Sequence, residues 1–128
     1  MSFQGKKVLV VDDNADARDL LEDFLTPTGC QVVHASDGQK ALEAIDASGA
    51  FDLVITDEVM PKLSGSQLFA SIRQAKLETP VVIITGLKAH EIEPDRSLIP
   101  PPIVIEKPLK LKALLSQIEA IFSGVDAS

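Results

Sequence analysis

The chain contains no tryptophan, no tyrosine and only one cysteine, Cys30. A single cysteine excludes a disulfide within the chain and is typical of a protein from a reducing compartment. The apolar runs reach only four residues, as at residues 81–84, whereas a membrane-spanning helix needs about 20. Residues 1–7 also lack the apolar stretch and the small-residue cleavage site of a signal peptide. Together these absences predict a cytoplasmic protein.

Positive charge is also scarce, because 12 lysines and arginines stand against 19 acidic residues and give a formal net charge of −7. An acidic surface repels nucleic acids and anionic membranes, so we expect this domain to bind neither. A length of 128 residues suffices for one domain with a hydrophobic core. We expect that domain to cover residues 1–124 and the tail, residues 125–128, to fray.

Short apolar runs alternate along the chain with segments whose apolar residues repeat at helical spacing. The predicted strands lie at residues 8–11, 31–35, 53–56, 81–85 and 103–105, and the predicted helices around residues 17–24, 41–45, 68–75 and 111–122. Continuous apolar strands are typical of a sheet that is covered on both faces. Strand–helix alternation therefore predicts an α/β fold in which helices cover both faces of a doubly wound parallel sheet.

The segment between the fourth and fifth strands departs from this alternation. Pro94 interrupts it, and three prolines follow at residues 100–102. Proline breaks a helix interior, and consecutive prolines favour an extended backbone. We expect one or two helical turns at most in this fourth connection.

Reactive side chains follow four of the predicted strands. Asp12 and Asp13 come after the first, Asp57 after the third, Thr85 at the end of the fourth, and Lys107 after the fifth. The carboxyl ends of parallel strands meet at one edge, which is where such folds bind ligands. Clustered carboxylates suit Mg²⁺, and a carboxylate beside that metal can attack phosphorus. A lysine would supply positive charge to the phosphate oxygens as their charge develops, and a threonine hydroxyl would donate a hydrogen bond to one of them.

The motifs at these positions resemble those of the receiver domains of two-component response regulators, including the chemotaxis regulators. The resemblance covers nearly the whole chain and is carried by residues 8–13 (Val-Leu-Val-Val-Asp-Asp), residues 57–65 (Asp-Glu-Val-Met-Pro-Lys-Leu-Ser-Gly), Thr85-Gly86 and Lys107-Pro108. It implies a flavodoxin-like, five-stranded parallel sheet in the order 2-1-3-4-5 between two helical layers.

The resemblance also implies a role for each residue. Asp57 would be the phosphoacceptor, and Asp12, Asp13, Asp57 and the backbone carbonyl of Val59 would bind Mg²⁺. Thr85 would be the switch hydroxyl, and Lys107 would bind the phosphoryl group and precede a cis proline. A sensor histidine kinase, a phosphotransfer protein or a small phosphodonor would supply the phosphoryl group. The chain would not be an enzyme, although as a phosphoacceptor it would assist its own phosphorylation and dephosphorylation. Phosphorylation would switch contacts with a downstream protein, and the chain would be a monomer or a weak phosphorylation-dependent dimer.

Three positions depart from the family pattern. Val104 stands where many receivers have a tyrosine or phenylalanine that moves with the switch hydroxyl, and a β-branched valine cannot make that movement. Val59 and Leu87 occupy positions that tune the lifetime of the phosphorylated state. Because both are apolar and neither can position a water, we expect slow self-dephosphorylation. Output through a rearranged loop at residues 87–102, or through another face such as the first helix, is our hypothesis.

Several other interpretations remain open. The chain could be a phosphorylation-independent docking module, or a flavodoxin-like cofactor binder, although it has no tryptophan or tyrosine to stack on a flavin. A metal-dependent hydrolase would need an acid or base such as Glu58 or Glu106. Asp13 or Asn14 could cap the first helix. The chain's histidines, His34 and His90, are interpreted as surface residues.

Overall fold

The computed structural model describes residues 3–48, 51–87, 92, 94–95 and 97–124. Its sheet has five parallel strands in the order β2-β1-β3-β4-β5. This order confirms the flavodoxin-like topology. The strands are β1 (Lys7–Val11), β2 (Gln31–Ala35), β3 (Leu53–Asp57), β4 (Val81–Thr85) and β5 (Ile103–Glu106), and the α-helices are α1 (Ala15–Leu25), α2 (Gly38–Ser48), α3 (Gly65–Gln74) and α4 (Leu111–Ser123). A short 3₁₀ helix, η1 (Thr26–Thr28), follows α1.

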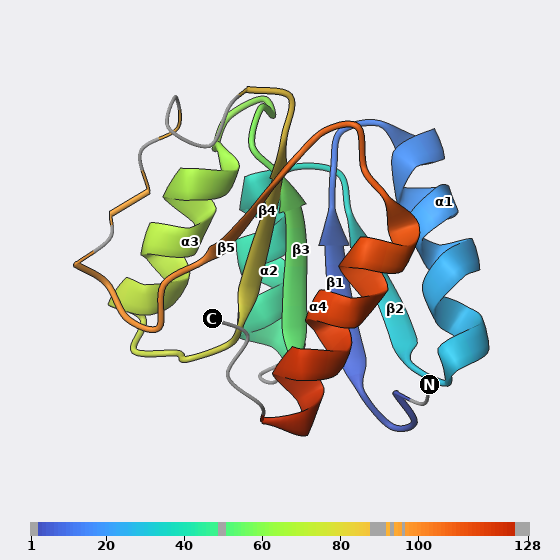
Figure 1. The fold of residues 1–128 in the computed structure, drawn as a ribbon. Coiled ribbons are helices and arrows are strands. Elements are labelled where there is room, and N and C mark those ends of the chain that lie inside the picture. Colours follow the sequence, from blue (N-terminus) through green and yellow to red (C-terminus); the bar gives the residue numbers. More distant parts are fainter. Residues whose placement is uncertain (1–2, 49–50, 88–91, 93, 96, 125–128) are drawn as a thin grey trace.

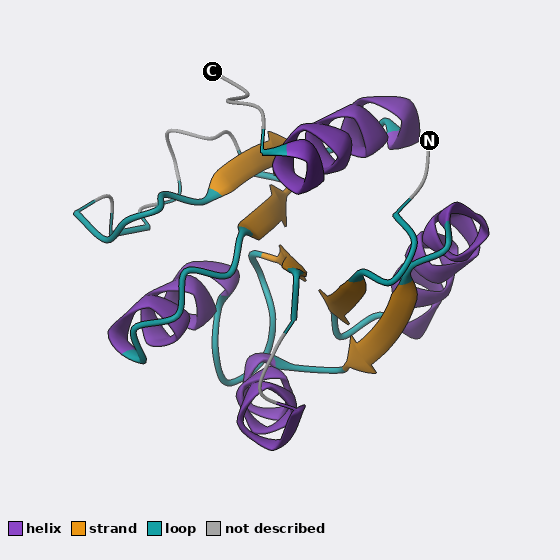
Figure 2. Ribbon diagram, turned by 90° about the horizontal axis from the view of Figure 1, so that it is seen from below, coloured by secondary structure: helices purple, strands orange, loops and turns teal. Residues whose placement is uncertain are grey.

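The helices form two layers with the sheet between them, as the resemblance implies. Figures 1 and 2 show α1 and α4 on one face of the sheet and α2 and α3 on the other. Among the described residues, no helix is both long enough and apolar enough to cross a membrane.

Alternation along the central strands divides the hydrophobic core into two halves. In β1, Val8 and Val10 pack with residues of α1 and α4, whereas Leu9 and Val11 pack with residues of α2 and α3. Side chains of a strand point alternately to the two faces of its sheet, so a strand buried on both faces must be apolar at every position. This requirement explains the continuous apolar runs of the sequence and leaves polar groups to gather beyond the strand ends.

Two helices begin with side-chain caps near that edge. Asn14 Oδ1 accepts hydrogen bonds from the backbone N–H groups of Asp16 and Ala17, at 2.9 and 3.3 Å, and so caps α1. Ser64 caps α3 in a reciprocal arrangement with Gln67. Of the two residues that the sequence offered as a cap of the first helix, Asn14 takes the role, and this leaves Asp13 at the edge of the sheet.

The connection from β4 to β5 contains no helical residue among those that the structure describes there, which are 86, 87, 92, 94, 95 and 97–102. Ile92 is nevertheless buried in the core on the side of α2 and α3, where half-buried Leu98 and Val104 also pack. The backbone carbonyl of Pro100 accepts a 2.8 Å hydrogen bond from Arg73 Nε of α3. The connection is therefore anchored to the core without a helix, consistent with its prolines.

Candidate functional site

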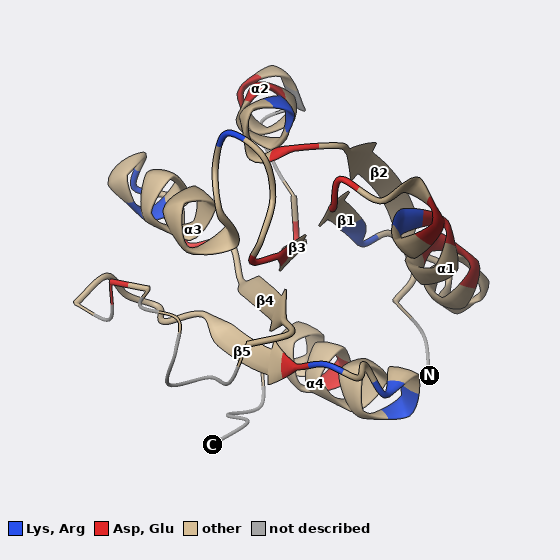
Figure 3. Ribbon diagram, turned by 90° about the horizontal axis from the view of Figure 1, so that it is seen from above, with Lys and Arg blue, Asp and Glu red and all other residues tan. Residues whose placement is uncertain are grey.

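The carboxylates predicted to form a metal site lie together at the carboxyl edge of the sheet. Asp12 and Asp13 follow β1 and Asp57 ends β3, and each offers an oxygen within 4.8 Å of the oxygens of the other two. Asp13 is exposed, while Asp12 and Asp57 are half-buried. Figure 3 looks onto this edge and shows acidic segments at the ends of β1 and β3 and a basic segment beyond β5. Three negative charges thus face one another.

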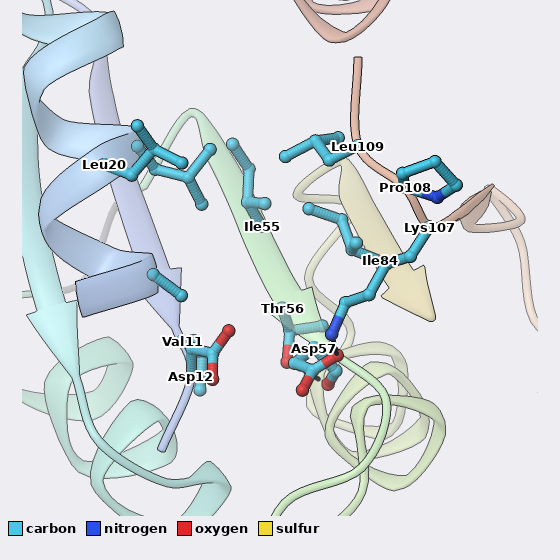
Figure 4. A pocket seen from close by; sticks show the side chains of 12 residues that line it. Val11, Asp12, Leu20, Ile55, Thr56, Asp57, Ile84, Lys107, Pro108 and Leu109 are labelled. Carbon is cyan, nitrogen blue, oxygen red and sulfur yellow. Dashed lines mark hydrogen bonds and ion pairs between the residues drawn. The ribbon is translucent and has the colours of Figure 1, made fainter. Parts of the chain in front are cut away.

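Lys107 reaches this cluster from the opposite side. Its Nζ lies 3.1 Å from Oδ1 of Asp57, and the two side chains are 45% and 12% exposed. Figure 4 shows the lysine side chain extending from beyond β5 toward the carboxylate. The backbone N–H of Lys107 donates to the Thr85 carbonyl at 2.7 Å, and the Lys107–Pro108 bond is cis, as expected. Asp57 therefore has an acidic neighbour on one side and a cation on the other.

Thr85 lies one residue beyond Ile84, which is the register partner of Asp57 in the pairing of β3 with β4. The threonine is fully buried, and its Oγ1 accepts a 2.9 Å hydrogen bond from the backbone N–H of Leu87. A hydroxyl both donates and accepts, so its proton remains for another acceptor at the same edge. This position suits the role that the sequence assigned to Thr85, and that role stays a prediction.

The electrostatics of the cluster appear in the pKa of Asp12. Burial is the main cause that raises this pKa above its ordinary value of 3.8, and the charge of Asp57 raises it further. The backbone N–H of Asn14 and the charge of Lys107 act in the opposite direction. Like charges at short range disfavour ionisation, and a bound cation reverses that effect. A positively charged ligand would therefore stabilise the ionised carboxylates of this site.

Residues 58–64 join Asp57 to α3 through a close backbone contact. A side chain at Gly65 would place its Cβ only 2.5 Å from the carbonyl oxygen of Asp57, so this turn requires glycine. Glu58 Oε1 accepts from the backbone N–H and the hydroxyl of Ser66, both at 2.8 Å. Glu58 is thereby committed to the start of α3, which weakens the hydrolase interpretation. Val59 is 66% exposed, and its carbonyl as a metal ligand stays a prediction.

An apolar pocket of about 210 Å³ opens beside Asp57, between α1 and the segment that joins β5 to α4. Its walls include Leu20, Ile55 and Leu109, and Asp57 and Lys107 also line it. Leu20 is 53% exposed, although it belongs to the apolar stripe of α1. The pocket therefore places apolar walls next to the Asp57 carboxylate.

Sequence reasoning missed a polar network beneath α1. His34 is half-buried rather than a surface residue, and it lies between Arg18 Nε, at 3.3 Å from Nδ1, and Glu22 Oε1, at 3.1 Å from Nε2. Arg18 also donates from Nη1 to the Asp12 carbonyl. The i, i+4 spacing of Arg18 and Glu22 was the available signal, but their common partner on β2 is distant in sequence. His90 lies outside the described residues.

Asp19 lies near this histidine, so Asp19, Glu22 and His34 together have the proximity of a metal site. The hydrogen bonds oppose that use. Arginine can only donate, so Nδ1 of the neutral His34 ring accepts from Arg18 and the ring proton sits on Nε2, facing Glu22. A metal would need Nε2 without its proton. We therefore interpret the network as structural.

Comparisons with known proteins agree with the geometry. The family model for the response regulator receiver domain matches residues 8–119. The response regulator receiver protein CpdR of Brucella abortus is 31% identical over 89% of this chain and 94% of its own length. The transcriptional regulatory protein CpxR of Escherichia coli is 35% identical over 90% of this chain but only 48% of its own length.

A solved structure of the response regulator TrrA from Thermotoga maritima, in complex with Mg²⁺ and BeF, superposes with a TM-score of 0.77. It is 29% identical in sequence, and the match covers 91% of this chain and 98% of that one. The fold and the edge site define a two-component signalling module, and the chain belongs to the response regulator receiver domain family. It spans nearly all of CpdR and about half of CpxR.

Proposed function

We propose that this receiver domain accepts a phosphoryl group on Asp57 in the presence of Mg²⁺. The observation that carries the proposal is the placement of the Asp57 carboxylate, 3.1 Å from the Lys107 ammonium and within 4.8 Å of two other carboxylates. This arrangement repels free phosphate until a cation is added. Once the cation is bound, the Asp57 carboxylate lies next to two positive charges, the cation and the Lys107 ammonium. Phosphoryl transfer requires such charges around the transferred group.

The donor groups of the site fit magnesium. Asp12, Asp13 and Asp57 supply only hard oxygen ligands, which Mg²⁺ prefers. Burial, and after it the charge of Asp57, raises the pKa of Asp12, so a bound cation would favour the ionised carboxylate. We assign these three carboxylates and the Val59 carbonyl as the residues that hold the ion. When bound, Mg²⁺ supplies charge that neutralises the phosphate oxygens.

The remaining steps belong to the protein's own residues. A carboxylate oxygen of Asp57 forms the new bond to phosphorus, while the bond from phosphorus to the donor breaks and its electron pair leaves with the donor. We assign Lys107 to a phosphoryl oxygen, and its half-exposed ammonium beside Asp57 supports this role. The Thr85 hydroxyl would donate to another phosphoryl oxygen. The domain thus acts as a phosphorylated switch that assists its own modification.

We further propose that a histidine kinase or phosphotransfer protein is the donor and that it docks in the pocket lined by Leu20 and Leu109. Apolar walls beside a charged centre suit a protein partner that buries its own apolar side chains there. Leu20→Asp should then slow transfer from a phosphorylated kinase at least tenfold and leave labelling by acetyl phosphate unchanged. Equal transfer rates to both proteins would contradict docking at this pocket.

We propose that the receiver domain covers residues 1–124 and that it signals through protein contacts. Residues 125–128, predicted to fray, lie outside the described residues. The half-buried Val104 and Leu98 pack against the same core cluster that contains the buried Ile92. We infer that this apolar group takes the place of a moving aromatic ring, so that output passes through the β4–β5 connection.

Mass spectrometry after treatment with acetyl phosphate tests the central proposal. The wild type should gain one phosphoryl group when Mg²⁺ is present and none when EDTA removes it. The variant Asp57→Asn should gain none under either condition. A phosphorylated Asp57→Asn protein, or a wild type that binds Mg²⁺ but is never labelled, would overturn the assignment of Asp57.

A further inference from the structure

Two loops that are distant in sequence meet tightly beside the proposed metal site. Residues 58–64 follow the proposed phosphoacceptor, and we call them the phosphoacceptor loop. Gly38, the first residue of α2, is buried against Leu63 of this loop. A Cβ at position 38 would lie 2.6 Å from the Cβ of Leu63 and 3.1 Å from its carbonyl oxygen. The Leu63 Cβ is fixed to the backbone and cannot rotate away. Any side chain at position 38 must therefore displace the main chain of the loop or of the start of α2.

A buried carboxylate reinforces the same contact. Asp37 Oδ1 accepts a 2.8 Å hydrogen bond from the backbone N–H of Lys40, within the first turn of α2. Its Oδ2 lies 3.6 Å from Nζ of Lys62. Lys62 has a φ of 71°, a left-handed conformation that a lysine adopts only at an energetic cost. One aspartate thus links the start of α2 to a strained residue of the phosphoacceptor loop.

The two contacts differ in strength. The Lys62 side chain is 66% exposed, and an ion pair in such a position changes an equilibrium by about fivefold at most. The contact between the buried Gly38 and the half-buried Leu63 involves a Cβ that cannot rotate away, so a close approach there must be relieved by movement of the backbone. The glycine contact is therefore the dominant constraint, and the ion pair is secondary.

The other end of the loop is fastened to α3. The backbone N–H of Gly65 donates to the Glu58 carbonyl at 2.9 Å, and Glu58 also holds Ser66. The loop is thus fixed at its base by α3 and on its far side by α2. Val59, with the carbonyl assigned to the metal, lies between these two attachments.

We propose that Gly38, supported by Asp37, is a positioning residue that sets the backbone of residues 58–64 and thereby the affinity of the site for Mg²⁺. This inference rests on the proposed function, because it assigns part of the metal geometry to residues that do not touch the metal. It makes α2 a support of the phosphoacceptor loop as well as a layer of the fold.

The variant Gly38→Ala tests the proposal. Alanine favours a helix over glycine by about fourfold per residue, so the substitution supports α2 while it displaces Leu63. We expect the dissociation constant for Mg²⁺, measured by calorimetry, to rise at least tenfold. Without Mg²⁺, the amide NMR signals of residues 59–64 should shift, and the urea midpoint should fall, because the added methyl group overpacks a tight contact. Gln39→Ala, at the next and exposed position of α2, is the matched control and should bind Mg²⁺ like the wild type.

If Gly38→Ala does not fold, the variant Asp37→Asn provides an independent test. Asparagine caps a helix as well as aspartate does, so this variant keeps the start of α2 and loses the charge that faces Lys62. We expect Mg²⁺ affinity to fall about threefold, and Lys62→Met to have the same effect with no further loss in the double variant. Wild-type Mg²⁺ affinity in both Gly38→Ala and Asp37→Asn would overturn the positioning role. A wild type that binds no Mg²⁺ would instead overturn the proposed function.

Discussion

Two cationic side chains, Lys107 at the carboxyl edge and Arg73 in α3, show how differently this fold uses positive charge. Lys107 is 45% exposed and faces the Asp57 carboxylate at 3.1 Å. Arg73 is only 7% exposed, and burial is the main cause that lowers its pKa from the ordinary value. The first charge is accessible to a ligand that arrives and departs. The second is part of the core.

The partners of Arg73 explain why the protein keeps a charge in that place. Its Nη1 donates to the carbonyls of Leu77 and Thr79, at 2.9 and 2.8 Å, and its Nε donates to Pro100. The guanidinium also lies over the ring of Phe69, 5.0 Å from its centroid. One side chain thus joins α3, the turn before β4 and the connection before β5. Arg73 thus supplies the hydrogen-bond donor for three backbone carbonyls in part-buried contacts.

Arg73→Met should produce the largest effect on stability. Methionine fills much of the same volume but leaves the three carbonyls without their donor, and such a loss costs about 3 kcal/mol. Urea unfolding should show this decrease, and amide hydrogen exchange at residues 97–99, which precede the prolines, should become faster. Lys76→Met, at an exposed position just beyond α3, should change stability by less than about 0.5 kcal/mol. Equal stability of the Arg73 and Lys76 variants would remove the contrast between the two cations.

Lys107→Met should affect chemistry instead of stability. Its ion pair with Asp57 is half-exposed, and such pairs contribute less than about 1 kcal/mol to folding. The initial rate of labelling by acetyl phosphate should nevertheless fall at least about tenfold, because a charge aimed at the transferring group is lost. Lys112→Met, on the exposed side of α4, is the control and should keep the wild-type rate. A large loss of stability with an unchanged rate would mean that Lys107 is structural, like Arg73.

The carboxyl-edge site around Lys107 could be predicted from the sequence, whereas the core contacts of Arg73 could not. The edge site was predictable because Asp12, Asp57 and Lys107 each follow an apolar run, and parallel topology places the ends of such runs together. The partners of Arg73 are backbone carbonyls as far away as Pro100, and a carbonyl carries no sequence signal. The Gly38–Leu63 contact and the His34 network also join segments distant in the chain. Periodicity locates elements, but it does not identify contacts between their ends.

The smallest expected effect concerns Asp12, whose charge at the carboxyl edge of the sheet should lower the stability of the metal-free protein. Its pKa is raised, chiefly by burial, so the folded protein binds the proton more tightly than the unfolded chain does. Stability without Mg²⁺ should therefore decrease as pH rises above the ordinary carboxyl value of 3.8 and should stay lower above the raised value. Asp12→Asn removes this cost, so at pH 7 it should stabilise the metal-free protein, by about 0.5 kcal/mol once solvent screening is included.

The pH dependence of this difference distinguishes charge repulsion from a packing effect. Below the ordinary carboxyl value, Asp12 is protonated in both the folded and the unfolded chain, so wild type and Asp12→Asn should unfold at the same urea concentration. Adding Mg²⁺ at neutral pH should reverse the order, because the wild type gains the binding energy of the ion and the variant gains less. Asp46→Asn, exposed on α2, should show no such reversal. If Asp12→Asn remained more stable than the wild type at low pH, Asp12 would destabilise the fold through packing and not through its charge. Repulsion between carboxylates would then not be what destabilises the metal-free site.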